Sequence, residues 1–261
     1  MIGLSAGLIA AAAGASLSYG DTLLETMRGL HLEITSAQIT IISGKAAPII
    51  VERRWVGPTR AFERRPLLDA NGSEIGTLVL GSLCPRLTNA DVVGYELSRR
   101  IYSSASLLDP DPLVAGAVRA PKAQAMIEDA LEKDPTIVTL AFHLIPPGKK
   151  INSIVASSFG RIGKPADADD ARIIRDGTIV KETTNNGRRM AVELPLLDSG
   201  RHIIGALSTS FRLDPGSDEI QIEKRAVALR DAFSRRTPSI KALFRSATAS
   251  RQVRALPTCH P

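Results

Sequence analysis

A short basic loop is the clearest candidate for ligand chemistry in this sequence. The loop Gly160-Arg161-Ile162-Gly163-Lys164 places two cationic side chains in a turn just before a segment that predicts a helix. Guanidinium and ammonium groups at a helix start can hold a carboxylate through charge-assisted hydrogen bonds. The loop is not a P-loop, because its spacing differs and no Ser or Thr follows the lysine. A plain turn between a strand and a helix is the alternative interpretation.

Further polar residues belong to the strands that flank this loop. His143 lies in an alternating run, on the opposite face from Phe142, and a pocket-lining or surface position is favoured over a catalytic one. Buried cations cost several kcal/mol without a partner, so a pocket that contains them needs an anionic occupant or a carboxylate. We therefore expect a small carboxylate ligand, with Arg161 as its leading charge partner. The candidate ligand-binding residues are Arg161, Lys164, His143, Ser157 and Arg189.

The remaining acidic residues and histidines form no catalytic or metal-binding pattern. Asp167, Asp169 and Asp170 lack the glycine and the terminal glutamate of an EF-hand loop, so helix capping explains them. The histidines are dispersed and have no metal-ligand spacing, and no G-x-S-x-G motif accompanies them. We expect no catalytic residue, no metal and no cofactor.

The strands that would position the site belong to a sequence repeat. Pro66-Leu67-Leu68-Asp69 recurs as Pro195-Leu196-Leu197-Asp198, and the Ile-Gly-x-Leu motif that contains Gly76 recurs around Gly205. Both motifs are displaced by the same 129 residues (195 − 66 and 205 − 76). This shared offset predicts two copies of one α+β unit, with Gly76 and Gly205 at equivalent places in two three-stranded meanders.

The second copy has the more complete pattern of elements. Its segments predict a helix after Pro121, strands over 136–144 and 151–157, a short helix over 165–177, strands over 178–183, 188–197 and 203–213, and a helix from residue 217 or 218. Asp167 is the expected N-cap of the short helix and Gly177 its end. Asn185-Asn186-Gly187 predicts a hairpin turn.

The first copy is expected to be abbreviated. Its pattern predicts a helix from Asp21 to about Gly44, strands over 48–52, 59–68 and 75–80, and a helix that begins at Asn89 or Asp91. It shows no equivalent of the first two strands of the second copy. The predicted fold class is α+β, with two PAS-like units, each an antiparallel sheet flanked by helices.

One family resemblance extends this interpretation. Ala141–Gly148, Ile154–Ser157, Gly160–Asp170, Glu193–Asp198 and Ile204–Leu207 resemble the exported PDC (Cache-type, PAS-like) sensor domains of bacteria, over residues 120–244. The resemblance implies a pocket between the sheet and the loops around the short helix. It also implies a small organic anion or amino acid as ligand. An envelope receptor or sensor protein is the expected signalling partner, and a homodimer is compatible with the fold.

Composition restricts the compartment and the class of partner. The chain has 261 residues, a net charge of +6 and only 4% aromatic residues, which argues against a stacking platform for nucleic acid. Residues 1–18 carry no charge and are rich in Ala, Gly, Leu and Ile, which is typical of a signal peptide, although no Lys or Arg precedes the apolar run. We therefore expect a periplasmic or secreted protein. The spacing of Cys84 and Cys259 does not decide whether they pair.

These observations predict an organisation and a function. The expected segments are a signal peptide (1–18), an abbreviated PAS-like unit (19–108), a linker with two Asp-Pro pairs (109–119), a complete PAS-like unit (120–244) and a basic tail (245–261). The expected function is that of a non-enzymatic, exported sensory or small-ligand-binding protein. A protein–protein interaction module without ligand and an enzyme of unknown class are the alternatives.

Overall fold

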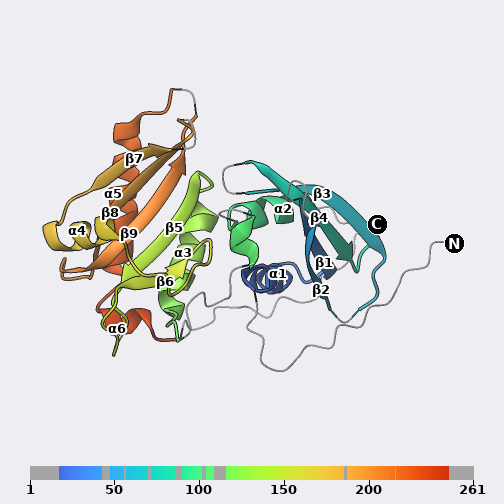
Figure 1. The fold of residues 1–261 in the computed structure, drawn as a ribbon, viewed down its shortest axis with the longest axis horizontal. Helices are drawn as coiled ribbons and strands as arrows, with labels where there is room; N and C mark the ends of the chain where they lie inside the picture. Colours follow the sequence, from blue (N-terminus) through green and yellow to red (C-terminus); the bar gives the residue numbers. More distant parts are fainter. Residues whose placement is uncertain are drawn as a thin grey trace.

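The chain forms two α+β units that lie side by side, each built on an antiparallel sheet (Figure 1). The computed structural model describes residues 18–42, 48–55, 57–69, 72–85, 90–101, 104–108, 116–184, 187–214 and 216–246. Antiparallel sheets flanked by helices confirm the predicted α+β fold class.

The first unit has a four-stranded sheet in the order β2-β1-β4-β3. Its elements are α1 (Tyr19–Leu30), β1 (Ile34–Ile41), β2 (Ile49–Arg54), β3 (Ala61–Leu68), β4 (Glu74–Ser82), α2 (Ala90–Ser98) and the short 3-10 helix η1 (Ala105–Leu108). Alternate residues of β1, including Ile39 and Ile41, pack with Leu24 and Met27 of α1 and Leu97 of α2 in one buried core. Both helices therefore cover the same face of this sheet.

The second unit has a five-stranded sheet in the order β6-β5-β9-β8-β7. Its elements are α3 (Pro121–Lys133), β5 (Ile137–Leu144), β6 (Ser153–Ser157), α4 (Ala168–Asp176), β7 (Val180–Thr184), β8 (Arg189–Leu197), β9 (Ile203–Arg212), α5 (Glu219–Arg235) and α6 (Ile240–Leu243). Phe142, Phe211 and Phe233 lie in a core shared by the sheet, α3 and α5. This order of elements is the one that the sequence predicts, with α6 added at the end.

The repeat places the two glycines at equivalent backbone positions. Gly76 pairs with Leu67 and Gly205 pairs with Leu196, and a register shift follows at once in both hairpins. A Cβ added at Gly76 would lie 2.0 Å from the carbonyl oxygen of Thr40, and one at Gly205 would lie 2.2 Å from that of His143. Only glycine allows the central strand to approach so closely. The predicted equivalence is confirmed, but β3 and β4 form a hairpin beside β1, and only the second unit has a three-stranded meander.

The prediction of one long helix from Asp21 to about Gly44 is wrong. The helix α1 ends at Leu30, His31 caps it, and β1 follows. Ile and Thr dominate β1, and such β-branched side chains pack well on a pleated sheet but lose freedom in a helix. Pairing with β2 on one side and β4 on the other then fixes the strand.

The first unit is abbreviated, but not at the predicted place. It has β1 and β2, which correspond in sheet order to β5 and β6. Only residues 55–60 connect β2 to β3, whereas residues 158–188 connect β6 to β8 and include α4 and β7. Six residues cannot hold a helix and a strand, so the first unit lacks the cover that α4 gives to the second sheet.

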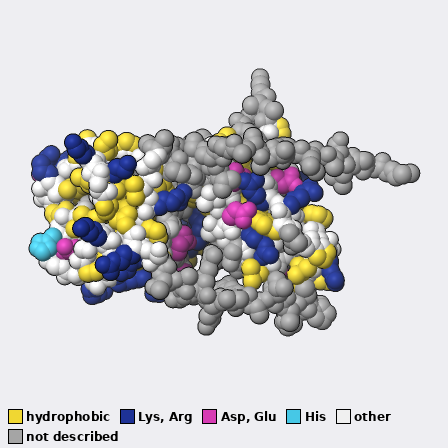
Figure 2. All heavy atoms as spheres, turned by 90° about the horizontal axis from the view of Figure 1, so that it is seen from below, with side chains coloured by type: hydrophobic (Ala, Val, Ile, Leu, Met, Phe, Trp, Pro, Cys, Tyr) yellow, Lys and Arg dark blue, Asp and Glu magenta, His cyan; other side chains and the backbone are white. Residues whose placement is uncertain are grey.

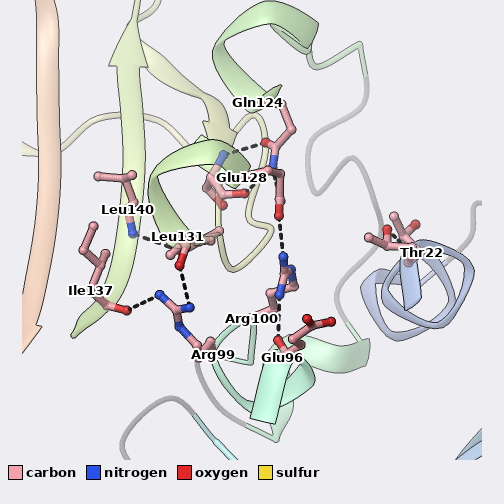
Figure 3. Close-up of polar contacts among 12 residues, drawn as sticks. Thr22, Glu96, Arg99, Arg100, Gln124, Glu128, Leu131, Ile137 and Leu140 are labelled. Atoms are coloured by element: carbon pink, nitrogen blue, oxygen red, sulfur yellow. Dashed lines mark hydrogen bonds and ion pairs between the residues drawn. The ribbon is translucent and has the colours of Figure 1, made fainter. Parts of the chain in front are cut away.

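Arg99, which directly follows α2, binds the first unit to the second (Figure 3). The Arg99 guanidinium donates to the backbone oxygens of Leu131 at 2.7 Å, Asp134 at 2.9 Å and Ile137 at 3.1 Å. The last carbonyls of a helix lack partners within it, so Arg99 caps the C-terminal end of α3. The neighbouring Arg100 donates to the Glu128 carboxylate of α3 at 2.5 Å.

A second contact joins α1 to the loop that follows β6. The Tyr19 hydroxyl donates to the Arg100 backbone oxygen at 2.8 Å and lies 3.3 Å from that of Ser158. A Cβ added at Gly160 would lie 2.7 Å from the Tyr19 ring, so the ring packs directly on the backbone of this loop. The first unit therefore supports the loop that contains Arg161.

We expect the stability of the first unit to fall at alkaline pH because of His31. Its Nε2 lies 2.8 Å from Glu96 and its Nδ1 lies 3.6 Å from Glu33. Burial alone would lower the pKa of His31, but the two carboxylates outweigh it and raise the pKa from 6.5 to about 9. The folded pKa exceeds the unfolded one, so this stabilisation is complete below pH 6.5 and is lost as the pH rises through 9.

Urea unfolding of the wild type and of His31→Gln between about pH 6 and about pH 10 measures this effect. The wild type should lose up to about 3 kcal/mol more than the variant, since one pKa unit corresponds to about 1.4 kcal/mol. Groups that titrate in both proteins cancel in the comparison. The same pH dependence in both proteins would show that His31 is not responsible.

Several predictions concern residues outside the described ranges. They include residues 1–17 of the predicted signal peptide, most of the 109–119 linker, Asn89, the Asn-Asn part of the hairpin turn, Cys259 and most of the basic tail, and they stay predictions. Among the helices that the structure describes, none is long and apolar enough to span a membrane.

Candidate ligand site on the second sheet

The sheet of the second unit has an apolar face and a polar face. Phe142 on β5 points into the core beneath α3 and α5, so its neighbour His143 projects from the opposite face. On the same face Glu193 of β8 pairs in register with Ser208 of β9, and the Ser208 hydroxyl donates to Glu193 at 3.3 Å. This face of the sheet therefore carries small and titratable side chains, whereas a face that only packs against other elements would be expected to carry apolar ones.

The helix α4 covers the β8–β9 half of this polar face. Asp167 caps the helix: its side chain accepts from the backbone N–H groups of Asp169 and Asp170, and the Asp170 side chain accepts from the N–H of Asp167. Gly177 ends the helix with φ 68°. Both predicted helix boundaries are confirmed, and this start places the Asp170 carboxylate next to the sheet.

His143 and Asp170 form a buried pair across this interface. Their Nδ1 and Oδ2 atoms are 2.8 Å apart, and both side chains are almost fully buried. The contact has the distance of an ion pair but not the angle of a hydrogen bond, and Nδ1 has no hydrogen-bond partner within the described residues. The other oxygen, Asp170 Oδ1, also lacks one there. A buried carboxylate oxygen without a donor is costly, which makes this the place where an occupant is most strongly favoured.

Glu193 adds a second carboxylate to the cluster. Burial raises the pKa of Glu193, and the negative charges of Asp170 and Asp167 raise it further, while His143 and Ser208 act in the opposite direction. These carboxylates therefore interact, and the centre of the polar face is acidic. A cationic donor at this place would relieve the repulsion between them.

The loop over residues 158–166 covers the β5–β6 half of the same face. Ile162 packs with Ala141 of β5 and Ile154 of β6 in a small buried cluster. Within this loop Arg161 adopts a positive φ of 61°, and both Arg161 and Lys164 are half-buried. The polar face thus lies under an acidic helix on one side and a basic loop on the other.

Two of the predicted site residues have structural contacts. The Ser157 hydroxyl accepts from the Phe159 N–H and donates to the Gly160 backbone oxygen, so it shapes the loop. Arg189 starts β8, pairs in register with Arg212, and donates from Nε to the Thr184 hydroxyl at 2.9 Å. The structure places His143 in the cluster and Arg161 and Lys164 in the loop that covers it, whereas Arg189 is the first residue of β8, four residues before Glu193.

Asp170, Glu193 and Ser208 were not assigned to the ligand site from the sequence. Asp170 was interpreted as a helix-capping acid, and it also faces His143. A signal for Glu193 was present, because it is a charged residue between Val192 and Leu194 in an otherwise apolar strand. In the described part of the chain, no group of three or more His, Cys, Asp or Glu side chains could hold a metal ion.

A hollow of about 430 Å³ lies away from the polar face, at the turn between β7 and β8 and the start of α5. It is lined by Thr183, Gly187, Arg188, Leu213, Asp214, Gly216, Ser217 and Glu219. Residues 185, 186 and 215, which adjoin this lining, fall outside the described ranges. None of the predicted site residues lines it.

The positive net charge does not form one basic surface on the face seen in Figure 2. Lys and Arg side chains are spread over the second unit among hydrophobic ones in that view. The net charge therefore indicates no particular binding surface in this view, whereas His143, Asp170 and Glu193 form one defined cluster.

Comparisons with known proteins do not identify a family. No protein-family profile and no curated protein matches the chain. Similar solved structures include the nlh2 GAF domain of A. aeolicus, with 9% identity and a TM-score of 0.34 over 50% of this chain and 86% of that one. The inducer-binding domain of PobR from Acinetobacter, complexed with 3-hydroxybenzoic acid, has 12% identity and a TM-score of 0.31 over 46% and 98%.

The C-terminal domain of the E. coli transcriptional regulator KdgR has 14% identity and a TM-score of 0.28, over 47% of this chain and 96% of that one. At these TM-scores the similarity identifies neither a family nor a ligand. The resemblance to exported PDC sensor domains stays a prediction.

Proposed function

We propose that this chain is a non-enzymatic sensory module whose second unit binds a free amino acid. The ligand lies on the polar face of the second sheet, beneath α4 and the 158–166 loop. The observation that carries the proposal is the buried cluster of His143, Asp170 and Glu193, in which Asp170 Oδ1 has no hydrogen-bond partner among the described residues.

The charges around the face favour a zwitterion. Asp170 and Glu193 accept an ammonium group, which supplies the missing donor and lowers the repulsion between the two carboxylates. Arg161 and Lys164 belong to the loop that covers the β5–β6 half of the face, and a carboxylate close to this loop would have two cations as partners. A simple carboxylic acid would pair only with Arg161 and Lys164, and it would leave Asp170 and Glu193 without a cationic partner.

Binding requires the cover to move. The polar face is closed by α4 and by Ile162 of the loop, and both are packed against the sheet. An amino acid that enters must displace this cover and close it again, and such a change can be passed to a partner. The contact between Tyr19 and the loop backbone gives one route to the first unit.

Thermal unfolding of the full chain with a panel of proteinogenic amino acids tests the proposal. A ligand at a hundredfold excess over its Kd should stabilise the protein by about 2.7 kcal/mol. The amine that lacks the carboxylate of the best amino acid, and the acid that lacks its ammonium group, should both bind more weakly. No stabilisation by any member of the panel would contradict the proposal.

Two variants test whether the amino acid binds at the polar face. Glu193→Gln keeps the shape of the side chain, and Glu193 lies outside the capping box of α4, so the fold should be retained. The loss of a hydrogen bond to a charged group should weaken ligand binding roughly tenfold or more. Asp169→Asn changes an exposed acid of the same helix and should bind like the wild type. Equal affinities in the two variants would exclude the polar face as the site.

A further inference from the structure

A second cavity lies on the opposite, apolar face of the same sheet, between α3 and α5. Its volume is about 160 Å³. It is lined by Asp129, Ala130, Lys133, Asp134, Ile137, Phe211, Arg225, Leu229, Ala232, Phe233 and Arg236. None of these residues belongs to the polar face beneath α4, so this cavity is independent of the proposed amino-acid site.

The inner wall of the cavity is apolar and rigid. Ile137, Phe211 and Phe233 are almost fully buried core residues, and Phe142 packs edge-on against Phe233 with ring centroids 5.0 Å apart. The cavity is open to solvent at its charged mouth, and its volume of about 160 Å³ is close to that of an engineered cavity that accepts benzene. The volume therefore suits one aromatic ring or one short branched chain.

Charged side chains surround the mouth of the cavity. Arg225 contacts Asp134 at 2.5 Å, and Asp129 accepts from Arg236 at 2.7 Å and from Lys133 at 2.8 Å. Three cations against two carboxylates leave a net charge of +1 at the mouth. This balance favours a ligand with a single negative charge over a neutral or cationic one.

Both arginines keep unused donors. Arg225 directs only Nη2 at Asp134 and at the Thr136 hydroxyl, and Arg236 directs only Nη1 at Asp129. A guanidinium has five N–H donors, and within the described residues the other nitrogens of these two have no partner. The Arg225 guanidinium also lies 5.1 Å from the centroid of the Phe211 ring, which holds it at the edge of the apolar wall.

We propose that this cavity binds a compact apolar monocarboxylate, an aromatic ring or branched aliphatic chain that carries one carboxylate. The apolar body lies against Phe211 and Phe233, and the carboxylate accepts hydrogen bonds from Arg225 and Arg236 at the mouth. A carboxylate and a guanidinium form paired, charge-assisted hydrogen bonds, which a neutral ligand of the same shape cannot supply.

Calorimetric titration of the full chain with benzoate, benzamide and benzylamine tests the charge requirement. Benzoate should bind at least tenfold more tightly than neutral benzamide, and benzylamine should not bind. Comparable affinities for benzoate and benzamide, or no binding of benzoate, would overturn the proposal.

The last residue of α5, Arg235, and its C-cap, Arg236, provide a matched pair of variants. Arg236→Gln removes a cation at the mouth and should weaken benzoate binding roughly tenfold or more. Arg235→Gln makes the same change at an exposed residue outside the cavity and should leave the affinity unchanged. Ala232→Leu narrows the cavity and should abolish binding, whereas Glu193→Gln, on the other face, should have no effect. Equal benzoate affinities in the Arg235 and Arg236 variants would refute the assigned site.

Discussion

Arg99→Ala is expected to lower the free energy of unfolding by about 3–5 kcal/mol and to uncouple the two units. The half-buried guanidinium donates to three backbone oxygens of the second unit and lies 5.6 Å from the centroid of the Tyr95 ring. Its removal leaves carbonyls at the end of α3 without their donor, in a place that water reaches poorly. The hydrogen bonds from Tyr19 to Ser158, from Tyr95 to Pro135 and from Arg100 to Glu128 then still join the two units.

Denaturant unfolding followed by two probes measures this effect. The fluorescence of Trp55, the sole tryptophan, reports on the first unit, and circular dichroism reports on both. The two transitions should coincide in the wild type and separate in Arg99→Ala. Arg54→Ala serves as the control, because Arg54 is largely exposed and, among the described residues, its side chain pairs only with Glu52 on the same strand. A loss no larger than that of the control would show that Arg99 does not hold the units together.

Gly205→Ala is expected to cost about 3 kcal/mol or more, at the upper end of the cost of overpacking. The added methyl group would lie 2.2 Å from the carbonyl oxygen of His143, on the neighbouring strand β5. Both atoms belong to central strands, so neither can move without distorting the sheet and the position of His143. Gly76→Ala should be about as harmful, since the equivalent distance to Thr40 is 2.0 Å.

Gly94→Ala adds the same methyl group but is expected to raise the free energy of unfolding. Gly94 lies within α2, and nothing comes within 4 Å of its added Cβ. Alanine in a helix interior is favoured over glycine by about 1 kcal/mol, so this variant should be slightly more stable than the wild type. Thermal or urea unfolding of the three variants measures the differences. A tolerated Gly205→Ala change would contradict the close approach of the strands.

The repeat was the part of the fold that the sequence specified best. The equivalence of Gly76 and Gly205 could be predicted from the sequence. Each lies against a backbone carbonyl that leaves no room for a side chain, so both copies of the repeat need glycine at this position. The caps of α4 were predictable for a similar local reason, since Asp167 and Gly177 act within one helix.

Long-range pairing was harder to predict. The strand β1 was mistaken for a continuation of α1, because no proline or C-terminal glycine separates them and its strand character depends on β2 and β4. The candidate ligand site also depends on contacts between residues far apart in the sequence. His143, Asp170 and Glu193 are far apart in the chain, and only the packing of α4 on the sheet brings them together.

A crystal structure of the full chain, grown with the amino acid that stabilises it most, tests the central claim most directly. We expect the ligand to occupy the polar face, with its ammonium nitrogen about 3 Å from Asp170 Oδ1 and its carboxylate towards the loop of Arg161 and Lys164. An amino acid bound elsewhere, or one whose carboxylate faces Asp170, would contradict it.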